Sequence, residues 1–569
     1  MKPQRKPVAR KPAPAAAPPR GQGLFASLQR RLRETPPAAR LPFAIVFLAG
    51  LNLSLIHYVS LNELPSLLGS NELVALIVLA AYFLGLSGGY LISDKLSRAQ
   101  LLAIGAATLA LHVTLPFSAR WVAGTMWRIN LQGLTPPFLF FLVLLGITPF
   151  YAVFLPRLVD AAEDVGPRPV DPAAGARRLV PLYATELLGS VAGLLISALL
   201  TPARLGVILT LHLAGILGLL MLSGRSRDGD RDRRVLLARL VVPLCAVYLA
   251  LFSTLDRSSL EYFYKHRRGF PRVEMLASEL SPYQRVDLFE ATTKRGKTRY
   301  LYLNGNLFYG STTLHQHNLA VSILPNLMVG RPSNALVIAG GSLDAARYLA
   351  PRVEHLRVVE LDEAVTRLAR EHLQEPRGGF PTNWDLIIDD GKHFLGTWEG
   401  KPFDVISVDV PIPAQLQTAS LHSDRFFALA RSRLAPGGIF SISLSGYYGP
   451  PGGEEDAFLS HLPERVMAGL LHSFPHVTVV EVDERAFAWA SDAPLGLTAD
   501  KIREKLGELL RAPDVRDVFG TPSIAVLDDA DARFRAAGFR PIGEADMQMV
   551  LRLSINKLHE RFYEPNAER

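Results

Sequence analysis

Seven long apolar runs in the first half of the chain constrain its fold most strongly. They lie at about residues 41–61, 73–93, 101–118, 136–156, 179–200, 205–223 and 236–254. A run of about 20 apolar residues is long enough to cross a bilayer as a helix, and soluble helices are rarely apolar on every face for so long. The sequence therefore predicts a multipass α-helical membrane domain of about seven helices over 41–255. It also predicts a multi-pass location in the cell membrane, with the lipid bilayer as a partner.

Basic residues gather in the tail and in alternate segments between these runs. The first 40 residues are basic, rich in Pro and Ala, and without an apolar stretch before a cleavage site, so we expect a disordered tail over 1–40. The basic residues of the alternate segments are Lys95, Arg98, Arg168, Arg177, Arg178, Arg225, Arg227, Arg231, Arg233 and Arg234. Cytoplasmic loops are enriched in Lys and Arg, which predicts a cytoplasmic tail and cytoplasmic basic segments. The net charge of +8 thus indicates membrane orientation and not nucleic-acid binding.

The stretch Asn334 to Arg347, NALVIAGGSLDAAR, has the pattern of a buried strand that turns through two glycines into a helix. Gly340 and Gly341 allow a ligand to approach the backbone, and the next helix directs its positive N-terminus toward it. A second strand, LRVVELD, brings Glu360 about twenty residues after the glycines, where such sheets hold a ribose. This pattern predicts an α/β Rossmann-like (class I methyltransferase-like) domain over 331–498.

Carboxylates follow two further strands in the same way. WDLIIDDG ends with Asp389 and Asp390, and FDVISVDVP contains Asp409 at the end of its strand. The carboxyl ends of parallel strands meet at one edge of a sheet, so Glu360, Asp390 and Asp409 should converge on one crevice. The alternative for each single Asp is that it only caps the following loop or helix.

Two flanking regions complete the predicted organisation. Short alternating strands between Ser281 and Ser311 predict a small β-sheet domain within 256–330. Amphipathic sequence from Ala499 predicts a C-terminal helical segment over 499–569.

The odd number of apolar runs conflicts with a cytoplasmic α/β domain. If the tail is inside and all seven runs cross, everything after Thr254 lies outside, where nucleotide-like cofactors are scarce. A re-entrant run would remove the conflict. The third run is the least regular, because Pro116 interrupts it and Arg120 and Arg128 follow in a loop expected outside. The sequence leaves the sidedness open.

Glu186, in YATELLGSVAGLL, is a carboxylate within an apolar run, and such a group is costly in a membrane unless it is paired or solvated. It could mark a proton or substrate path, or it could hold helices together with His57, His112 or His212 as a partner. Cys245 is the single cysteine, which excludes an intrachain disulfide and a thiolate metal site. The histidines lack metal-binding spacing, so we expect no metal.

The segments SPYQ, LNGN, VIAGG, VELD, IDDG, FDVISVD, LHSDRFF and LAPGGIF, between about Ser281 and Ser445, resemble the spermidine synthase (polyamine aminopropyltransferase) family. The apolar first half resembles its membrane-fused subgroup. The resemblance implies transfer of an aminopropyl group from decarboxylated S-adenosylmethionine to an amine acceptor, without a metal, and a homodimer. The donor-binding positions of the family fall on Gln284, Gly340, Gly341, Glu360, Asp390 and Gly391. In this assignment Gln284 would contact the sulfonium side of the donor, Glu360 its ribose and Asp390 its adenine.

The resemblance makes Asp409 the catalytic carboxylate that takes the proton from the attacking amine. His317 and Asn318 stand where the family has a Tyr-His pair that contacts the substrate, and the loop Val410 to Ser420 would close over the site. Acidic residues of the family are replaced in this chain at Asn304, Thr313, Leu314, Ser342 and Ile412. A polycation needs carboxylates to offset its desolvation, so the residues present favour donor binding more than binding of a diamine such as putrescine.

Two other functions are compatible with the sequence. The first is an S-adenosylmethionine-dependent methyltransferase on an amphiphilic acceptor, which the lost carboxylates favour. The second is a non-catalytic transporter or sensor with a nucleoside-binding domain and Glu186 in its membrane path. The chain has no P-loop, no Ser-His-Asp order and no interleaved aromatic and basic residues, so it predicts no phosphoryl transfer, acyl transfer or nucleic-acid binding.

Overall fold

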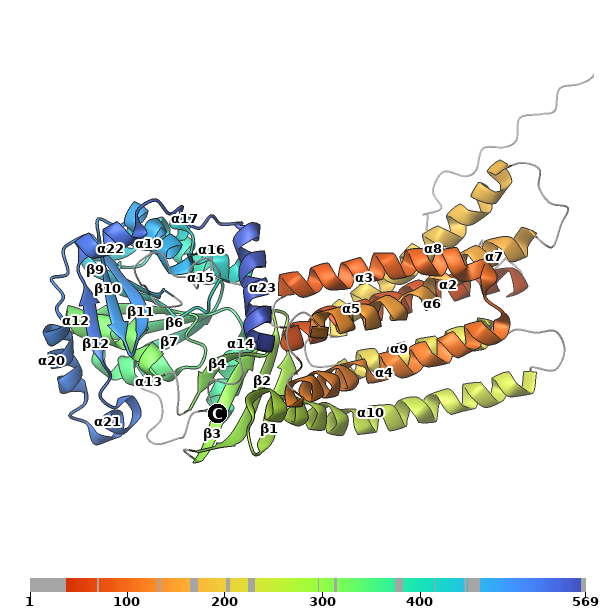
Figure 1. Ribbon diagram of the computed structural model, residues 1–569, viewed down its shortest axis with the longest axis horizontal. Helices are drawn as coiled ribbons and strands as arrows, with labels where there is room; N and C mark the ends of the chain where they lie inside the picture. Colours follow the sequence, from red (N-terminus) through yellow and green to blue (C-terminus); the bar gives the residue numbers. More distant parts are fainter. Residues whose placement is uncertain are drawn as a thin grey trace, which may run out of the picture.

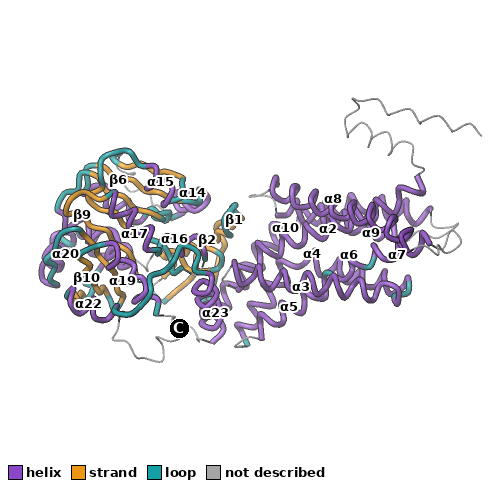
Figure 2. Tube along the Cα trace, turned by 90° about the horizontal axis from the view of Figure 1, so that it is seen from above, coloured by secondary structure: helices purple, strands orange, loops and turns teal. Residues whose placement is uncertain are grey.

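The computed structural model describes residues 37–563 with several gaps. The gaps are 69–70, 130, 132–134, 164–171, 201–204, 224–230, 295, 312–314, 374–381, 414, 445–447 and 449–460. Nearly all of the predicted disordered tail lies outside the described residues. A bundle of long helices occupies one end of the molecule and an α/β domain the other (Figure 1), and the same division is visible from above (Figure 2).

The helical bundle extends from α2 to α10. Its elements are α2 (Pro37–Leu68), α3 (Asn71–Ile92), η1 (Ser93–Lys95), α4 (Arg98–Arg128), α5 (Thr135–Ile147), α6 (Pro149–Ala152), α7 (Phe154–Glu163), α8 (Pro172–Leu200), α9 (Leu205–Ser223) and α10 (Arg231–Arg268). Among the described residues, seven helical stretches are long and apolar enough to cross a membrane, by length and composition. One of the seven, Phe138–Leu158, combines parts of α5, α6 and α7.

Helix α2 lies inside the bundle and α10 at its surface. The most apolar window of α2 is 61% buried, whereas that of α10 is 0% buried. Small residues bring α2 and α8 into backbone contact: a Cβ atom at Gly50 would lie 2.1 Å from the carbonyl oxygen of Glu186, and one at Gly189 would lie 2.1 Å from that of Phe47. A larger residue at either glycine would therefore force the two helices apart.

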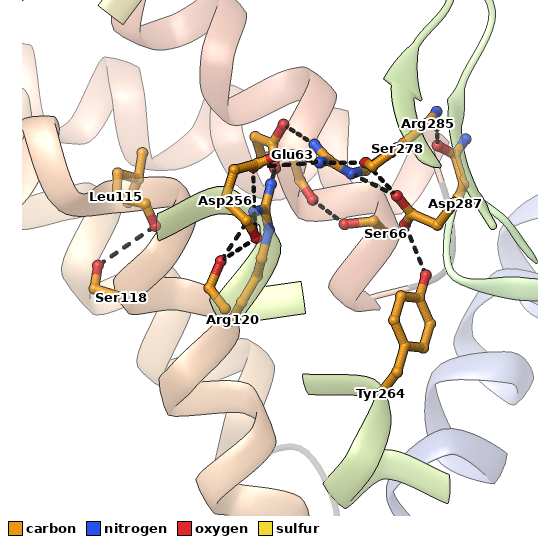
Figure 3. Close-up of polar contacts among 12 residues, drawn as sticks. Glu63, Ser66, Leu115, Ser118, Arg120, Asp256, Tyr264, Ser278, Arg285 and Asp287 are labelled. Atoms are coloured by element: carbon orange, nitrogen blue, oxygen red, sulfur yellow. Dashed lines mark hydrogen bonds and ion pairs between the residues drawn. The ribbon is translucent and has the colours of Figure 1, made fainter. Parts of the chain in front are cut away.

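The third apolar run differs from the sequence prediction. The sequence predicts a break near Pro116 and a loop containing Arg120 and Arg128, but α4 continues through all three positions. Arg120 is buried and forms ion pairs with Glu63 of α2 and Asp256 of α10 (Figure 3). Because these partners lie far away in the sequence, an arginine that looked solvent-exposed is neutralised inside the bundle.

Helix α10 joins the bundle to a small antiparallel sheet. The helix continues to Arg268, past the boundary expected at residue 255, because Leu260, Phe263 and Tyr264 form an apolar face that packs on the sheet. The sheet has the order β1 (Val273–Leu280), β2 (Arg285–Thr293), β3 (Gly296–Leu303) and β4 (Asn306–Gly310). One apolar cluster contains residues from the ends of α2, α3, α4 and α10 and from β1, β2 and β3. The bundle and the sheet therefore share a core.

The α/β domain is built on an eight-stranded sheet of Rossmann-like type. In chain order its strands are β5 (Asn334–Ile338), β6 (His355–Glu360), β7 (Trp384–Ile388), β8 (Phe403–Val408), β9 (Leu434–Ser443), β10 (His476–Val482), β11 (Arg485–Ser491) and β12 (Ile524–Leu527). In space they follow the order β12-β10-β11-β9-β8-β5-β6-β7. Neighbours from β9 to β7 are parallel, and β10, β11 and β12 add an antiparallel end.

Helices cover both faces of this sheet, because alternate strand residues belong to two different apolar clusters. The helical elements are α11 (His315–Asn318), η2 (Leu319–Ile323), α12 (Leu324–Val329), α13 (Asp344–Leu349), η3 (Ala350–Arg352), α14 (Glu363–His372), α15 (Gly391–Thr397), α16 (Leu416–Ser420), α17 (Asp424–Ser432), α19 (Leu462–Ser473), α20 (Ala499–Leu509), α21 (Pro513–Phe519), α22 (Asp529–Ala536) and α23 (Met547–Tyr563). The segment 499–569, predicted to be helical, also supplies β12, which pairs with β10. Four residues are too few to give a strand signal without their partner.

Candidate functional site

A pocket with an empty volume of about 1040 Å³ lies at the carboxyl edge of the parallel strands. Its walls are this strand edge, the β3–β4 hairpin and the loop after β8. Four of the predicted donor-binding residues line it: Gln284, Glu360, Asp390 and Gly391.

Backbone hydrogen bonds hold the strand ends together beyond the sheet. The Asp389 N–H donates to the Glu360 carbonyl at 3.0 Å, and the Asp409 N–H donates to the Ile338 carbonyl at 2.9 Å. Glu360 ends β6, and Asp390 and Asp409 follow β7 and β8, so all three lie at the same edge of the parallel part of the sheet. Their positions at successive strand ends predict this common edge. Glu360 and Asp390 line the pocket, whereas Asp409 does not belong to its lining.

The glycine turn after β5 makes room for Glu360. A Cβ atom at Gly341 would lie 2.4 Å from Glu360 Oε2, and one at Gly340 would lie 2.8 Å from Val337 Cγ1. Leu343 in the same turn has φ 62°, a left-handed conformation. The sequence predicts that both glycines admit the donor, but in the structure they accommodate side chains of the sheet, and neither belongs to the pocket lining.

Glu360 and Asp362 form a buried acidic pair beside the pocket. Burial raises the pKa of Glu360 to about 7, and its Oε1 accepts a hydrogen bond from the Asp362 N–H at 3.1 Å. Burial also raises the pKa of Asp362. Asp362 Oδ2 accepts from Ser281 Oγ at 2.7 Å and from Gln284 Nε2 at 3.2 Å. The Gln284 side chain is thus fixed against the wall of the pocket.

Asp390 both lines the pocket and caps a helix. Its Oδ1 accepts the His393 N–H at 2.8 Å, which makes it the N-cap of α15. The capping role considered for this residue is therefore present together with its pocket position. Gly391 packs against Ile338, since a Cβ atom there would lie 2.4 Å from Ile338 Cγ2.

Asp409 lies next to the pocket and is paired with a histidine. His317 Nε2 is 2.9 Å from Asp409 Oδ1, and the neighbouring Val410 lines the pocket. The Asp409 and His317 side chains are 10% and 23% exposed. Asn318, the second predicted substrate residue, instead donates its amide to Asp344 Oδ2 at 2.8 Å. Of the predicted substrate pair, His317 contacts the predicted catalytic carboxylate, whereas Asn318 faces a different carboxylate.

Comparison with known proteins identifies this domain. Residues 316–444 match the sequence model of the spermine/spermidine synthase domain. This part of the chain is a spermine/spermidine synthase domain. It is 29% identical over 410 residues to a polyamine aminopropyltransferase of Mycobacterium tuberculosis, covering 66% of this chain and 75% of that relative. It is 33% identical over 219 residues to a polyamine aminopropyltransferase of Corynebacterium efficiens, covering 37% of this chain and 41% of that relative.

Solved spermidine synthases are also similar to this chain. A spermidine synthase in complex with the transition state analogue AdoDATO shares 19% identity with a TM-score of 0.35, covering 43% of this chain and 88% of that one. The enzyme of Thermotoga maritima shares 20% identity with a TM-score of 0.34, covering 43% of this chain and 87% of that one.

A polar cluster around the buried Asp344 was not revealed by the sequence. Asp344, at the start of α13, accepts hydrogen bonds from Tyr309 Oη at 3.2 Å and Asn318 Nδ2 at 2.8 Å, and lies 3.1 Å from His315 Nδ1. Burial alone would lower the pKa of His315, but the hydrogen bond to Asp344 and its charge outweigh burial and raise that pKa. The partners come from β4 and α11, so no local motif marks the cluster.

Uncharged residues stand at the positions where the resemblance to the family predicts carboxylates, and they have different roles in the structure. Asn304 occupies the β3–β4 turn with φ 45° and accepts the Arg285 N–H at 2.9 Å. Ile412 lines the pocket and Ser342 is buried in the glycine turn. Thr313 and Leu314 lie outside the described residues.

Glu186 lies in the bundle, on α8, and not at the pocket. Among the described residues its Oε2 has no hydrogen-bond partner. His112 Nδ1 pairs instead with His212 Nε2 at 2.8 Å, and His57 packs edge-on against Tyr82. In the described part of the chain, no group of three or more His, Cys, Asp or Glu residues could hold a metal ion.

Proposed function

We propose that this chain is a membrane-bound aminopropyltransferase that moves an aminopropyl group from decarboxylated S-adenosylmethionine to an amine. One observation carries the proposal: in a spermidine synthase domain, Asp409 stands beside a pocket whose lining includes Gln284, Glu360 and Asp390. The row of carboxylates suits an adenosine that carries a positive sulfur.

The strand edge supplies the donor contacts. Ionised Glu360 would accept both ribose hydroxyl protons, Asp390 would meet the adenine, and the fixed Gln284 amide would lie toward the sulfonium.

The transfer is a substitution at the carbon next to the sulfonium. The lone pair of a neutral amine forms the new C–N bond, the C–S bond breaks, and its electrons leave the sulfur neutral in methylthioadenosine. The nitrogen must then lose a proton, and Asp409 would accept it while stabilising the positive charge that develops. His317, at 2.9 Å from Oδ1, would orient that carboxylate.

Membrane attachment is supported by the surface and length of the bundle. Large apolar side chains such as Leu199 and Val242 are 82% and 73% exposed, a cost that a surrounding bilayer would remove. The match to the Mycobacterium tuberculosis relative covers 66% of the chain, which is more than the part from β1 onward. That relative therefore matches part of the bundle as well.

The test is product release by the full chain in detergent. Given decarboxylated S-adenosylmethionine and a panel of amines, the protein should release methylthioadenosine.

Asp409→Asn should lower kcat by about 10²–10⁴-fold and leave methylthioadenosine affinity unchanged, because only proton removal is lost. Asp385→Asn, at an exposed carboxylate of β7, is the matched control and should change neither. Full turnover by Asp409→Asn would exclude Asp409 from the mechanism, and S-adenosylhomocysteine formed from S-adenosylmethionine would indicate a methyltransferase.

A further inference from the structure

One wall of the pocket is acidic, and the other two carry apolar and amide side chains. We propose that the acceptor is a monoamine with an apolar body, such as an alkylamine or an arylalkylamine, and not a linear diamine. This inference rests on the proposed aminopropyl transfer and adds to it the chemical class of the acceptor.

The walls opposite the strand edge are uncharged in the described part of the pocket. The β3–β4 hairpin contributes Leu303, Leu307 and Phe308, and the loop after β8 contributes Ile412, Gln417 and Leu421. The charged side chains of the described lining are Glu360, Asp362 and Asp390, and all three follow β6 or β7. An acceptor that enters beside the donor therefore meets apolar and amide groups.

The three acidic side chains are already engaged. Asp362 accepts hydrogen bonds from Ser281 and Gln284, Asp390 caps α15, and Glu360 accepts from the backbone of Asp362. In the proposed complex Glu360 also holds the ribose and Asp390 the adenine. None of them remains to neutralise a second ammonium group of the acceptor.

The charge balance decides between the two kinds of acceptor. A diamine that attacks through one nitrogen would place its other, protonated nitrogen against the hairpin or the loop, and burying an ammonium without a counter-charge is unfavourable. A methyl or phenyl group in the same place is instead stabilised by its removal from water.

The apolar wall is continuous with the end of the helical bundle. Leu307 lines the pocket and also packs against the cluster formed by the ends of α2, α3, α4 and α10. The adjacent hairpin turn touches α2, since a Cβ atom at Gly305 would lie 1.9 Å from the Ser66 carbonyl oxygen. An apolar amine near this end of the bundle would therefore contact the pocket wall at Leu307.

With a monoamine the same bonds form and break as in the transfer described above. Its nitrogen gains the aminopropyl carbon and loses one proton to Asp409, and methylthioadenosine leaves. The other product is an N-substituted 1,3-diaminopropane, which mass spectrometry identifies directly.

The decisive experiment compares n-butylamine with putrescine, which have the same four-carbon chain and differ by one terminal ammonium. With the full chain in detergent and decarboxylated S-adenosylmethionine, kcat/KM should be at least about tenfold higher for n-butylamine, a difference of about 1.4 kcal/mol. Phenethylamine should also be a better acceptor than putrescine. A preference for putrescine would overturn this inference and leave the proposed transferase intact, whereas no methylthioadenosine with any amine would overturn both.

A variant tests the missing counter-charge. Ile412 lies three residues after Asp409 in the pocket lining, so Ile412→Asp should raise kcat/KM for putrescine at least about tenfold and lower it for n-butylamine. Ile412→Asn, of the same shape without the charge, should not raise the putrescine value. An equal effect of both variants on the two amines would contradict the proposal.

Discussion

Glu360 should make donor binding depend on pH near neutrality. Burial raises its pKa from 4.5 to about 7, and only the ionised carboxylate can accept both ribose hydroxyl protons. About a tenth of the molecules carry this charge at pH 6 and about nine-tenths at pH 8, so methylthioadenosine affinity should rise roughly tenfold between these values. Isothermal titration calorimetry across this range measures the change.

Glu360→Gln is the control for this titration, because the amide has the same shape and no charge to lose. Its methylthioadenosine affinity should be weak and independent of pH. The variant should also be more stable than the wild type above pH 7. The folded-state pKa is raised, so ionising Glu360 costs stability as pH rises from about 4.5 to about 7, and the full cost of about 3 kcal/mol is present above that window. A pH-independent wild-type affinity would show that Glu360 does not hold the ribose.

Some features of the candidate site could be predicted from the sequence and others could not. The position of Glu360 after its strand was predictable, because strand ends and carboxylates are local features. The space that Gly341 leaves for Glu360 was not, since it depends on a contact between the turn after β5 and the end of β6. The same holds for Asp344, whose partners Tyr309 and His315 reach it from other elements.

An ion-pair network joins three elements of the bundle to the small sheet (Figure 3). Arg285 of β2 pairs with Glu63 of α2, Asp256 of α10 and Asp287 of its own strand. Burial alone would lower the pKa of Arg285, but these carboxylates outweigh burial and raise it, so the guanidinium stays charged. Since Gln284 precedes Arg285, the network also fixes the start of the pocket wall.

Removing the central cation should destabilise the junction. Arg285→Met removes the cation that Glu63, Asp256 and Asp287 share, and the loss of one partner of a buried pair costs about 3–5 kcal/mol. The Tm of the variant in detergent should fall by several degrees, and KM for the donor should rise because Gln284 loses its support. Lys505→Met, which breaks the surface pair with Glu508, should change neither value. An unchanged Tm in Arg285→Met would mean that the network contributes no net stability.

A second contact ties the loop over the pocket to helix α3. Glu72 Oε1 accepts the Leu416 N–H at 2.9 Å, at the start of α16. Glu72→Ala should loosen this loop, raise KM for both substrates and increase cleavage within 410–420 by limited proteolysis. Glu72→Gln keeps a carbonyl oxygen at this position and should resemble the wild type. Equal proteolysis of all three proteins would show that α3 does not hold the loop.

At the scale of elements, the sequence predicted apolar helices and parallel strands well because both have a local period. The prediction failed where contacts with residues remote in the sequence determine the local structure. Arg120 was assigned to a loop because Glu63 and Asp256 are remote in the sequence, and β12 was missed because its four residues are a strand only beside β10. The end of α10 was placed too early, because hydropathy falls after Thr254 while the apolar face of the helix continues.

Basic residues at the starts of several helices lie at one end of the bundle, and the α/β domain lies at the other (Figure 1). Helices α2, α4 and α10 all end in the cluster beside the small sheet, and α3 begins there. Helix α3 therefore ends, and α4 and α10 begin, at the opposite end of the bundle, where Lys95 and Arg98 lie. Helix α8 runs parallel to α2, because Gly189 contacts Phe47 and Gly193 contacts Leu51, so Arg177 and Arg178 near its start lie at that end as well. The first turn of α10 contains Arg231, Arg233 and Arg234.

The positive-inside rule then predicts that the α/β domain lies outside the cytoplasm. Alkaline phosphatase fused after Arg569, which is active only outside, should be active, whereas green fluorescent protein at the same position should stay dark. The matched control is the same pair of reporters inserted between α9 and α10, which should give the opposite result. If the C-terminal fusion instead fluoresces, one of the seven stretches does not cross, and a cytoplasmic pool of donor would supply the site directly. If phosphatase is active, the donor must first cross the membrane, and an amine acceptor would be drawn from the outer side of the bilayer, next to Leu307.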